Sequence, residues 1–178
     1  MSSPSNPAIR LMHQHKINDN CIHIDKTSFD ECERQILQIT RFFFLAFHHP
    51  ETHAWISAYK TSEKNFNTPY GATIANAVQI ALNILCGTRG AGLNYHDPKC
   101  ETCIKYITLH EHCFIETLYF IRKLNKFGAK ENAIILCEGM AENKFLDAMN
   151  KLATIIEEYH THKIKMPFYD NINIKRMH

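Results

Sequence analysis

Two cysteines, Cys100 and Cys103, form a C-x2-C pair near the middle of the chain. Cysteine thiolates bind zinc at about 2.3 Å, and two of them at this spacing can reach the same ion. His96 lies four residues before the pair, and the Asp-Pro step between them bends the chain. Cys86, fourteen residues before Cys100, would complete a Cys3His tetrahedron. The pattern therefore predicts a closed, structural zinc site.

His110 is a rival for the third ligand position. On a continuous helix it would lie seven residues beyond Cys103, about 10.5 Å along the axis, which one ion can hardly bridge. His110 can join the site only if the helix begins after Cys103. We therefore place His96 ahead of His110.

The same cysteines allow other readings. A reducible or sensing dithiol at Cys100 and Cys103 is the first alternative, since a thiolate is the reactive form of cysteine. A metalloenzyme is the second, with imidazoles from His49, His53 and His110 around an open coordination position. The cysteines can also be ordinary core residues.

Signatures of other catalytic chemistry are absent from the sequence. It contains no G-x-S-x-G nucleophile elbow and no H-E-x-x-H zinc-protease helix, and no local pattern marks an activated Cys–His pair. The sequence therefore favours a protein that is not an enzyme.

Charge and cysteine usage limit the partners and the compartment. The 20 Lys and Arg nearly balance the 18 Asp and Glu, so nucleic-acid binding has weak support, limited to a few dispersed cations in the C-terminal tail. The longest apolar run, Phe42 to Phe47, is far shorter than the roughly 20 residues of a membrane span. With 7 cysteines and no recognisable secretory signal, we expect reduced thiols in the cytoplasm.

Composition and periodicity predict an all-α fold. Gly and Pro are few, strand patterns are missing apart from a short extended segment around Cys21 to Ile24, and apolar residues recur at helical spacing. We expect a single-domain bundle of five to six helices. The predicted helices cover 28–48, a short segment from Pro50 to Tyr59, 68–87, a stretch from Lys99 or Thr102 to Asn125, 129–138 and 141–159.

Local signals set the expected helix ends. Ser28 and Glu31 match a capping box for the first helix. Asp97 and Pro98 supply a cap and a first-turn proline for the fourth, and Gly128 falls where a left-handed cap would follow it. This start would put both cysteines of the C-x2-C pair in a first helical turn, where the helix dipole favours thiolates.

These expectations combine into one interpretation. Residues 1–27 form a flexible N-terminal arm, 28–160 the helical domain, and 161–178 an irregular basic tail. The protein is a small cytoplasmic bundle held together by zinc, with a regulatory or adaptor-type role. It binds a protein partner, which can be a second copy of the chain. The aromatic residues Phe42 to Phe47 supply either core or a contact surface.

Overall fold

A computed structural model describes residues 12–13 and 21–165. Six α-helices form one bundle, which confirms the expected all-α class. The helices are α1 (Glu31–His48), α2 (Ala54–Phe66), α3 (Tyr70–Thr88), α4 (Leu109–Arg122), α5 (Lys126–Cys137) and α6 (Glu142–Lys165).

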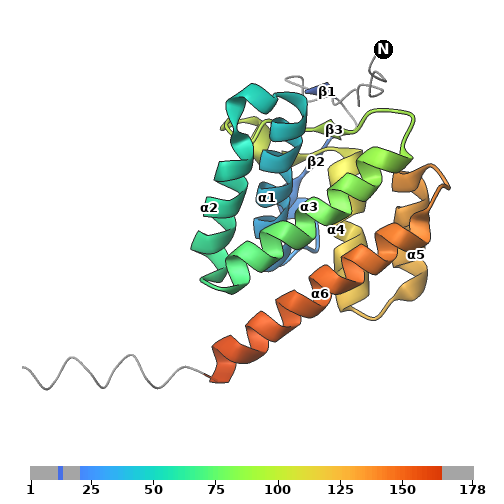
Figure 1. Cartoon of the computed structure of the whole chain (residues 1–178). Helices are drawn as coiled ribbons and strands as arrows, with labels where there is room; N and C mark the ends of the chain where they lie inside the picture. The colour runs from blue at the N-terminus through green and yellow to red at the C-terminus, as the bar shows by residue number, and fades with distance from the viewer. Residues whose placement is uncertain (1–11, 14–20, 166–178) are drawn as a thin grey trace, which may run out of the picture.

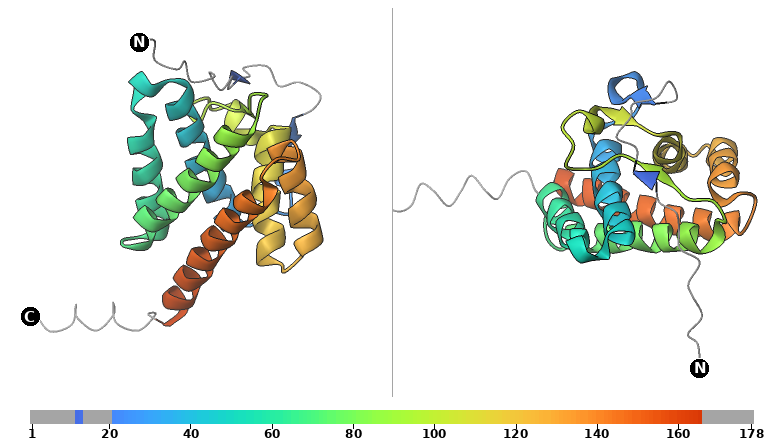
Figure 2. Two further views of the ribbon diagram at one scale, coloured as in Figure 1. Left: turned by 45° about the vertical axis from the view of Figure 1, so that its right-hand side comes forward. Right: turned by 90° about the horizontal axis from the view of Figure 1, so that it is seen from above.

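The helices pack as neighbouring pairs around a common apolar core. Figure 1 shows α3 and α6 side by side on a diagonal across the front, with α2 at one edge and α5 at the other. α1 and α4 lie behind them, and the right-hand view of Figure 2 shows this layering from above. The core includes Phe43 and Phe44 of α1, and the partly buried Phe42 and Phe47 pack against it, so the aromatic run of that helix contributes mainly to the core.

Four two-residue strands and three short 3-10 segments lie before α1 and in the connections between helices. Strand β1 (Met12–His13) pairs in parallel with β3 (Asn94–Tyr95), while β2 (Ile22–His23) pairs antiparallel with β4 (Tyr106–Ile107). The segment β2 confirms the extended stretch expected near Cys21. The 3-10 segments are η1 (Ile24–Lys26), η2 (Pro50–Thr52) and η3 (Cys103–Lys105). Both strand pairs join the N-terminal region to the connection between α3 and α4.

The predicted start of the first helix is wrong by two residues. Asp30, not Ser28, is the N-cap: its carboxylate accepts a hydrogen bond from the Glu33 backbone N–H at 3.0 Å, and Glu33 accepts from the Asp30 N–H at 2.8 Å. The sequence offers two overlapping capping boxes here. Arg122 of α4 contacts both Asp30 and Glu33, and this tertiary contact selects the second box.

The predicted start of the fourth helix is wrong by a larger margin. The helix α4 begins at Leu109, where Thr108 and Glu111 form a capping box. Residues 97–107 form turns, η3 and β4 instead. Arg41 of α1 donates hydrogen bonds to the backbone oxygens of Ile104 and Tyr106, so tertiary contacts take up carbonyls that a longer helix would use. Cys100 and Cys103 therefore lie before the helix and gain nothing from its dipole.

Other expected boundaries shift for local reasons. Pro50 opens η2, and α2 begins only at Ala54. Gly128 lies in the first turn of α5 and does not cap the end of α4. A Cβ on Gly128 would come within 2.8 Å of the Phe120 ring. The helix α6 continues to Lys165, beyond the expected helix end at residue 159 and the expected domain end at residue 160. The remainder of the predicted C-terminal tail and most of the predicted N-terminal arm lie outside the described residues.

Among the described helices, α3 alone has the length and composition that a membrane span requires, with a mean hydropathy of 1.2. Its neighbours in the bundle are α1, α2, α5 and α6, and Ile74, Val78 and Leu82 on it are fully buried. A helix buried in the core of a bundle can have the same length and hydropathy.

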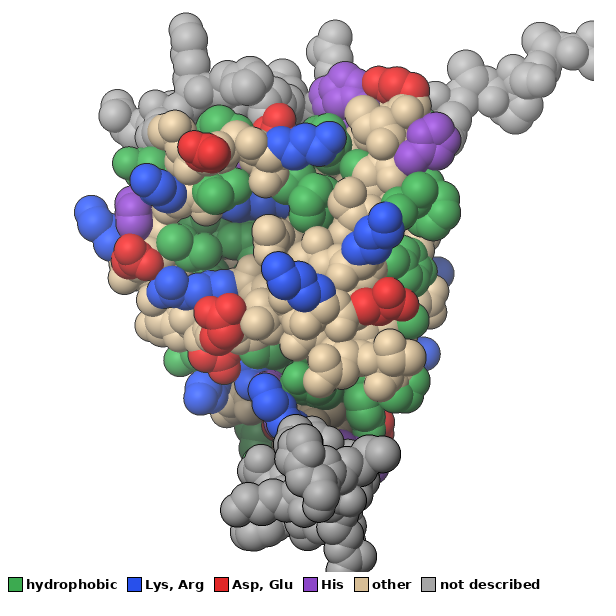
Figure 3. Space-filling model, turned by 90° about the vertical axis from the view of Figure 1, so that its left-hand side faces the viewer, with side chains coloured by type: hydrophobic (Ala, Val, Ile, Leu, Met, Phe, Trp, Pro, Cys, Tyr) green, Lys and Arg blue, Asp and Glu red, His purple; other side chains and the backbone are tan. Residues whose placement is uncertain are grey.

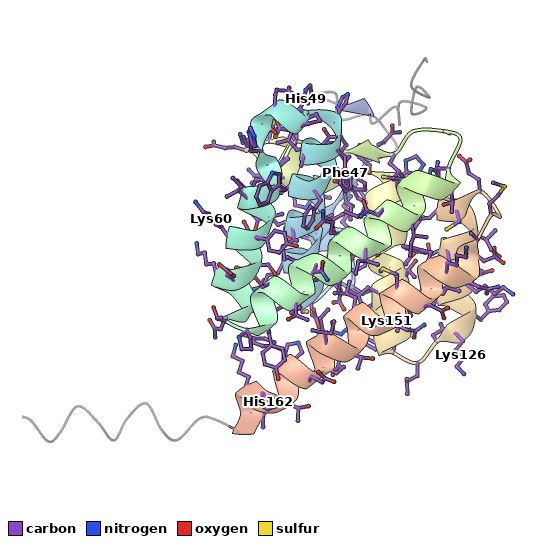
Figure 4. All side chains as sticks on the ribbon, in the orientation of Figure 1. Phe47, His49, Lys60, Lys126, Lys151 and His162 are labelled. Carbon is purple, nitrogen blue, oxygen red and sulfur yellow. The ribbon has the colours of Figure 1, made fainter. Side chains whose placement is uncertain are left out.

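The face formed largely by α2 carries charges of both signs. Figure 3 shows Lys and Arg side chains interspersed with Asp and Glu side chains and with small hydrophobic patches on this side. Lys60 on α2 and Lys126 on α5 extend from opposite edges of the bundle (Figure 4). This mixed face lacks the dense basic stripe by which a nucleic-acid interface is recognised.

The close approach of α2 and α3 makes a matched pair of glycine substitutions informative. A Cβ at Gly71 would overlap the Glu63 backbone, 2.7 Å from its nitrogen, whereas a Cβ at Gly87 meets nothing within 4 Å. Backbone atoms cannot rotate away as a side chain can. We expect Gly71→Ala to lower the free energy of unfolding by about 2 kcal/mol or more, and Gly87→Ala to raise it by about 0.5 kcal/mol. Urea denaturation of both variants checks this, and equal effects would contradict it.

Candidate functional site

The C-x2-C pair lies on a tight turn in the connection between α3 and α4. The Asp97 side chain accepts a hydrogen bond from the Lys99 N–H at 2.8 Å, and the Asp97 carbonyl accepts from the Cys100 N–H at 3.1 Å. The Ile104 N–H then donates to the Cys100 carbonyl at 3.0 Å. Asp97 thus caps this turn instead of a helix, and the turn folds Cys103 back toward Cys100.

The two sulfur atoms of the turn lie 2.8 Å apart. The backbone N–H of Cys103 also donates to the Cys100 sulfur at 3.3 Å. The Cys103 side chain is buried, while Cys100 is partly exposed. The turn therefore brings the two sulfurs together, and their joint role in metal binding or redox chemistry stays a prediction.

The two thiols have opposite pKa shifts. Hydrogen bonds from the Cys103 side chain and backbone hold the pKa of Cys100 below its usual value, because they stabilise the thiolate. Burial, followed by the interaction with Cys100, raises the pKa of Cys103 to about 11. The exposed sulfur is thus the stronger candidate for a nucleophile, and the buried sulfur keeps its proton.

A buried ion pair holds this loop to the bundle. Arg41 of α1 and Glu111 of α4 are almost fully buried, and the Arg41 Nε donates to the Glu111 carboxylate at 2.7 Å. The same carboxylate accepts from the backbone N–H groups of His96 at 3.0 Å and Thr108 at 2.9 Å. The loop is therefore attached to the ion pair on both sides of the cysteines, since Arg41 binds the carbonyl of Ile104 at 3.2 Å.

The other predicted zinc ligands are not assembled around the cysteine pair. Within residues 12–13 and 21–165, no group of three or more His, Cys, Asp or Glu is arranged to hold a metal ion. Cys86 lies in the last turns of α3, and burial raises its pKa to about 11. His96 is fully buried beside the Arg41–Glu111 pair. A role for either residue in metal binding stays a prediction.

His110 has other partners in this structure. Its Nδ1 accepts a hydrogen bond from the Asn94 N–H at 2.9 Å, and a guanidinium nitrogen of Arg89 lies 3.4 Å from its Nε2. Burial, and then the positive charge of Arg89, lower the pKa of His110. These contacts position the β3 end of the loop, and they place a cation where a metal ion would have to compete with it.

His49 and His53 lie at the junction of α1 and α2, where Figure 4 labels His49. Both contact Glu51: the Nδ1 of His49 lies 3.0 Å from the carboxylate, and the Nδ1 of His53 lies 3.0 Å from the backbone oxygen. His110 is engaged with Arg89 and Asn94 instead. The structure therefore does not gather the three histidines of the metalloenzyme alternative into one ligand group.

Sequence reasoning missed the Arg41–Glu111 pair. One signal was present, because Thr108 and Glu111 have the spacing of a capping box. A second was Arg41 beside the apolar run that begins at Phe42, since a charge in such a setting needs a buried partner. Neither signal identifies the other member of the pair.

No protein-family model, no curated protein and no solved structure matches the chain.

Removing the Arg41 charge should destabilise the whole bundle. Arg41→Met leaves the Glu111 carboxylate buried without its cation, and breaking a buried pair in this way costs about 3 to 5 kcal/mol. Arg34→Met is the control, because the exposed Arg34–Asp25 pair contributes at most about 1 kcal/mol. Chemical denaturation measures both, and a loss at Arg41 no larger than that at Arg34 would count against the anchoring role.

Alkylation should reveal the asymmetry of the two thiols. We expect a neutral reagent such as iodoacetamide to modify Cys100 before Cys103, with a half-maximal rate at a lower pH than for an ordinary cysteine, because the pKa of Cys100 is lowered. Cys103→Ala removes the S–H donor and should shift this midpoint upward. Peptide mass spectrometry follows each residue, with Cys32 as a slow internal control because burial raises its pKa to about 12. An unchanged midpoint in the variant would contradict the assignment.

Proposed function

We propose that this protein is a thiol–disulfide redox protein of a reducing compartment such as the cytoplasm. The observation that carries the proposal is the 2.8 Å separation of the Cys100 and Cys103 sulfurs, of which Cys103 is buried and Cys100 partly exposed. Cys100 acts as the nucleophile and Cys103 as the resolving thiol. The opposite pKa shifts of the two residues support this division of roles.

The reaction is an exchange with a disulfide R–S–S–R′. The Cys100 thiolate attacks one sulfur, forming an S–S bond to RS while the R–S–S–R′ bond breaks and R′S⁻ leaves. Cys103 then loses its proton to solvent, and its thiolate attacks the Cys100 sulfur and expels RS⁻. The protein dithiol is oxidised by two electrons, and the small disulfide is reduced to two thiols.

A sensing role fits the position of the dithiol. The bond between Cys100 and Cys103 would stiffen the turn whose Ile104 carbonyl is held by Arg41. Oxidation would therefore change the contact between α1, α4 and the loop. A protein partner or a second copy of the chain that binds this region would then bind the oxidised and reduced forms with different affinity.

A zinc site is the second candidate, and the convergence of the same two sulfurs favours it. Cys100 and Cys103 would supply two ligands, and His96, Cys86 or His110 would have to move to supply the others. In that case the bundle serves as a scaffold for macromolecular contacts, as the sequence suggests. The chemistry of the two sulfurs suits either role.

Mild oxidation of the purified, reduced protein distinguishes the two candidates. If the redox proposal holds, we expect each chain to lose two free thiols and to form one Cys100–Cys103 disulfide, seen in the peptide map, without release of metal. A zinc site would instead contain about one zinc per chain, released as the thiols are lost. Thiol titration, elemental analysis and peptide mapping provide the readouts. Cys100→Ser and Cys103→Ser should each abolish the disulfide, while Cys86→Ser should leave it intact; a dithiol that resists oxidation would refute the redox proposal.

A further inference from the structure

A pocket opens beside the loop that carries the dithiol. Its volume is about 540 Å³, within the range of small-molecule sites. Ile104 and Lys105, which directly follow Cys103, form one wall. Arg34 and Arg41 of α1 form another, and the η1 region closes the pocket with Asp25.

The charges that line the pocket are mostly positive. Asp25 pairs with Arg34 at 3.2 Å, and Glu111 neutralises Arg41 from beneath. Lys105 is exposed and has no ion pair with any residue in the described part of the chain. The lining therefore keeps one uncompensated cation.

Hydrogen-bond donors are also available there. The Nε of Arg34 donates to the Phe29 carbonyl and the Nη1 to Asp25, while its Nη2 has no hydrogen bond to a described residue. Together with the Lys105 ammonium, this amino group can bind a carboxylate. Arg41 contributes positive potential but few donors, because Glu111 and two carbonyls occupy most of its N–H groups.

The pocket and the dithiol share one short loop. Ile104 is bonded to Cys103 in the chain, and its N–H donates to the Cys100 carbonyl at 3.0 Å. Arg41, in the pocket lining, is also close enough to act electrostatically on the Cys103 thiol. Pro98 and Ile104, which flank the two cysteines, line the pocket, whereas the cysteines themselves do not. A ligand between Arg34 and Lys105 would thus lie beside the segment that holds both sulfurs.

We propose that this pocket selects the substrate of the dithiol, a low-molecular-weight disulfide that carries carboxylate groups. The inference rests on the proposed redox function. One carboxylate binds Lys105 and the Arg34 Nη2, and this contact holds the disulfide bond near Cys100 for attack. The electrons and protons balance as in the thiol–disulfide exchange above, and the anionic disulfide is reduced to two anionic thiols.

Three disulfides of different charge test this selection. The probes are dianionic 5,5′-dithiobis(2-nitrobenzoate), neutral 2,2′-dithiodipyridine and dicationic cystamine, each reacted with the full-length reduced protein. Rates of Cys100–Cys103 bond formation are followed by peptide mass spectrometry and divided by the rate of each probe with 2-mercaptoethanol. We expect a normalised preference of roughly tenfold for the dianion over the dication, declining in high salt because the pocket is open to solvent.

Two lysines on either side of the dithiol provide a matched pair of variants. Lys105→Gln should reduce the preference by about threefold or more. Lys99→Gln removes the same charge next to Cys100 but outside the pocket, so it should have a clearly smaller effect. Both side chains are exposed, and neither substitution disturbs the core.

The outcomes separate this inference from the function on which it rests. If no probe forms the Cys100–Cys103 disulfide, the redox proposal itself fails. If the disulfide forms with equal normalised rates for the dianion and the dication, the redox function stands and the selection is overturned. An effect of Lys99→Gln equal to that of Lys105→Gln also overturns the role of the pocket, because it would show only a general effect of charge near the cysteines.

Discussion

The buried ion pair between Arg41 and Glu111 holds α1, α4 and the cysteine loop in place. Moving two charges out of water costs several kcal/mol each, and only good geometry and further hydrogen bonds offset that cost. Here the guanidinium binds the carboxylate and two loop carbonyls, while the carboxylate accepts from two loop N–H groups. The pair therefore satisfies backbone groups that a connection outside any helix would otherwise leave unpaired, and it joins α1, α4 and the loop into one unit.

The reactivity of the cysteine pair follows from this attachment. With the loop held on either side, the turn from Asp97 to Ile104 has little freedom, and its hydrogen bonds bring the Cys103 sulfur toward Cys100. The inner thiol is shielded by the bundle and keeps its proton, whereas the outer thiol is stabilised as an anion by its neighbour. The fold thus converts two chemically identical residues into an ordered pair, and the adjoining pocket gives that pair a charged approach.

A second charged cluster stabilises the opposite end of α4. Arg122 contacts Asp30 and Glu33 at the start of α1 and Glu157 on α6. Burial raises the pKa of Glu33 to about 7, and hydrogen bonds with Glu33 together with the Arg122 charge bring the pKa of Asp30 to about 2 despite partial burial. The helix α4 is therefore attached to α1 by an ion pair near each end, which fixes its length and position in the bundle.

The helical class and most helix positions can be predicted from the sequence alone, because apolar spacing and proline or glycine positions act over a few neighbouring residues. The sequence also identified Cys100 and Cys103 as a pair. Tertiary contacts decided the rest: Arg122 selected the Asp30 cap over Ser28, and Arg41 kept residues 97–107 out of α4. Both arginines act on residues about sixty or more positions away, and a local pattern contains no information on which distant charge will pair with which. The difference in burial between the two thiols has the same origin, since it depends on which side of the turn faces the bundle.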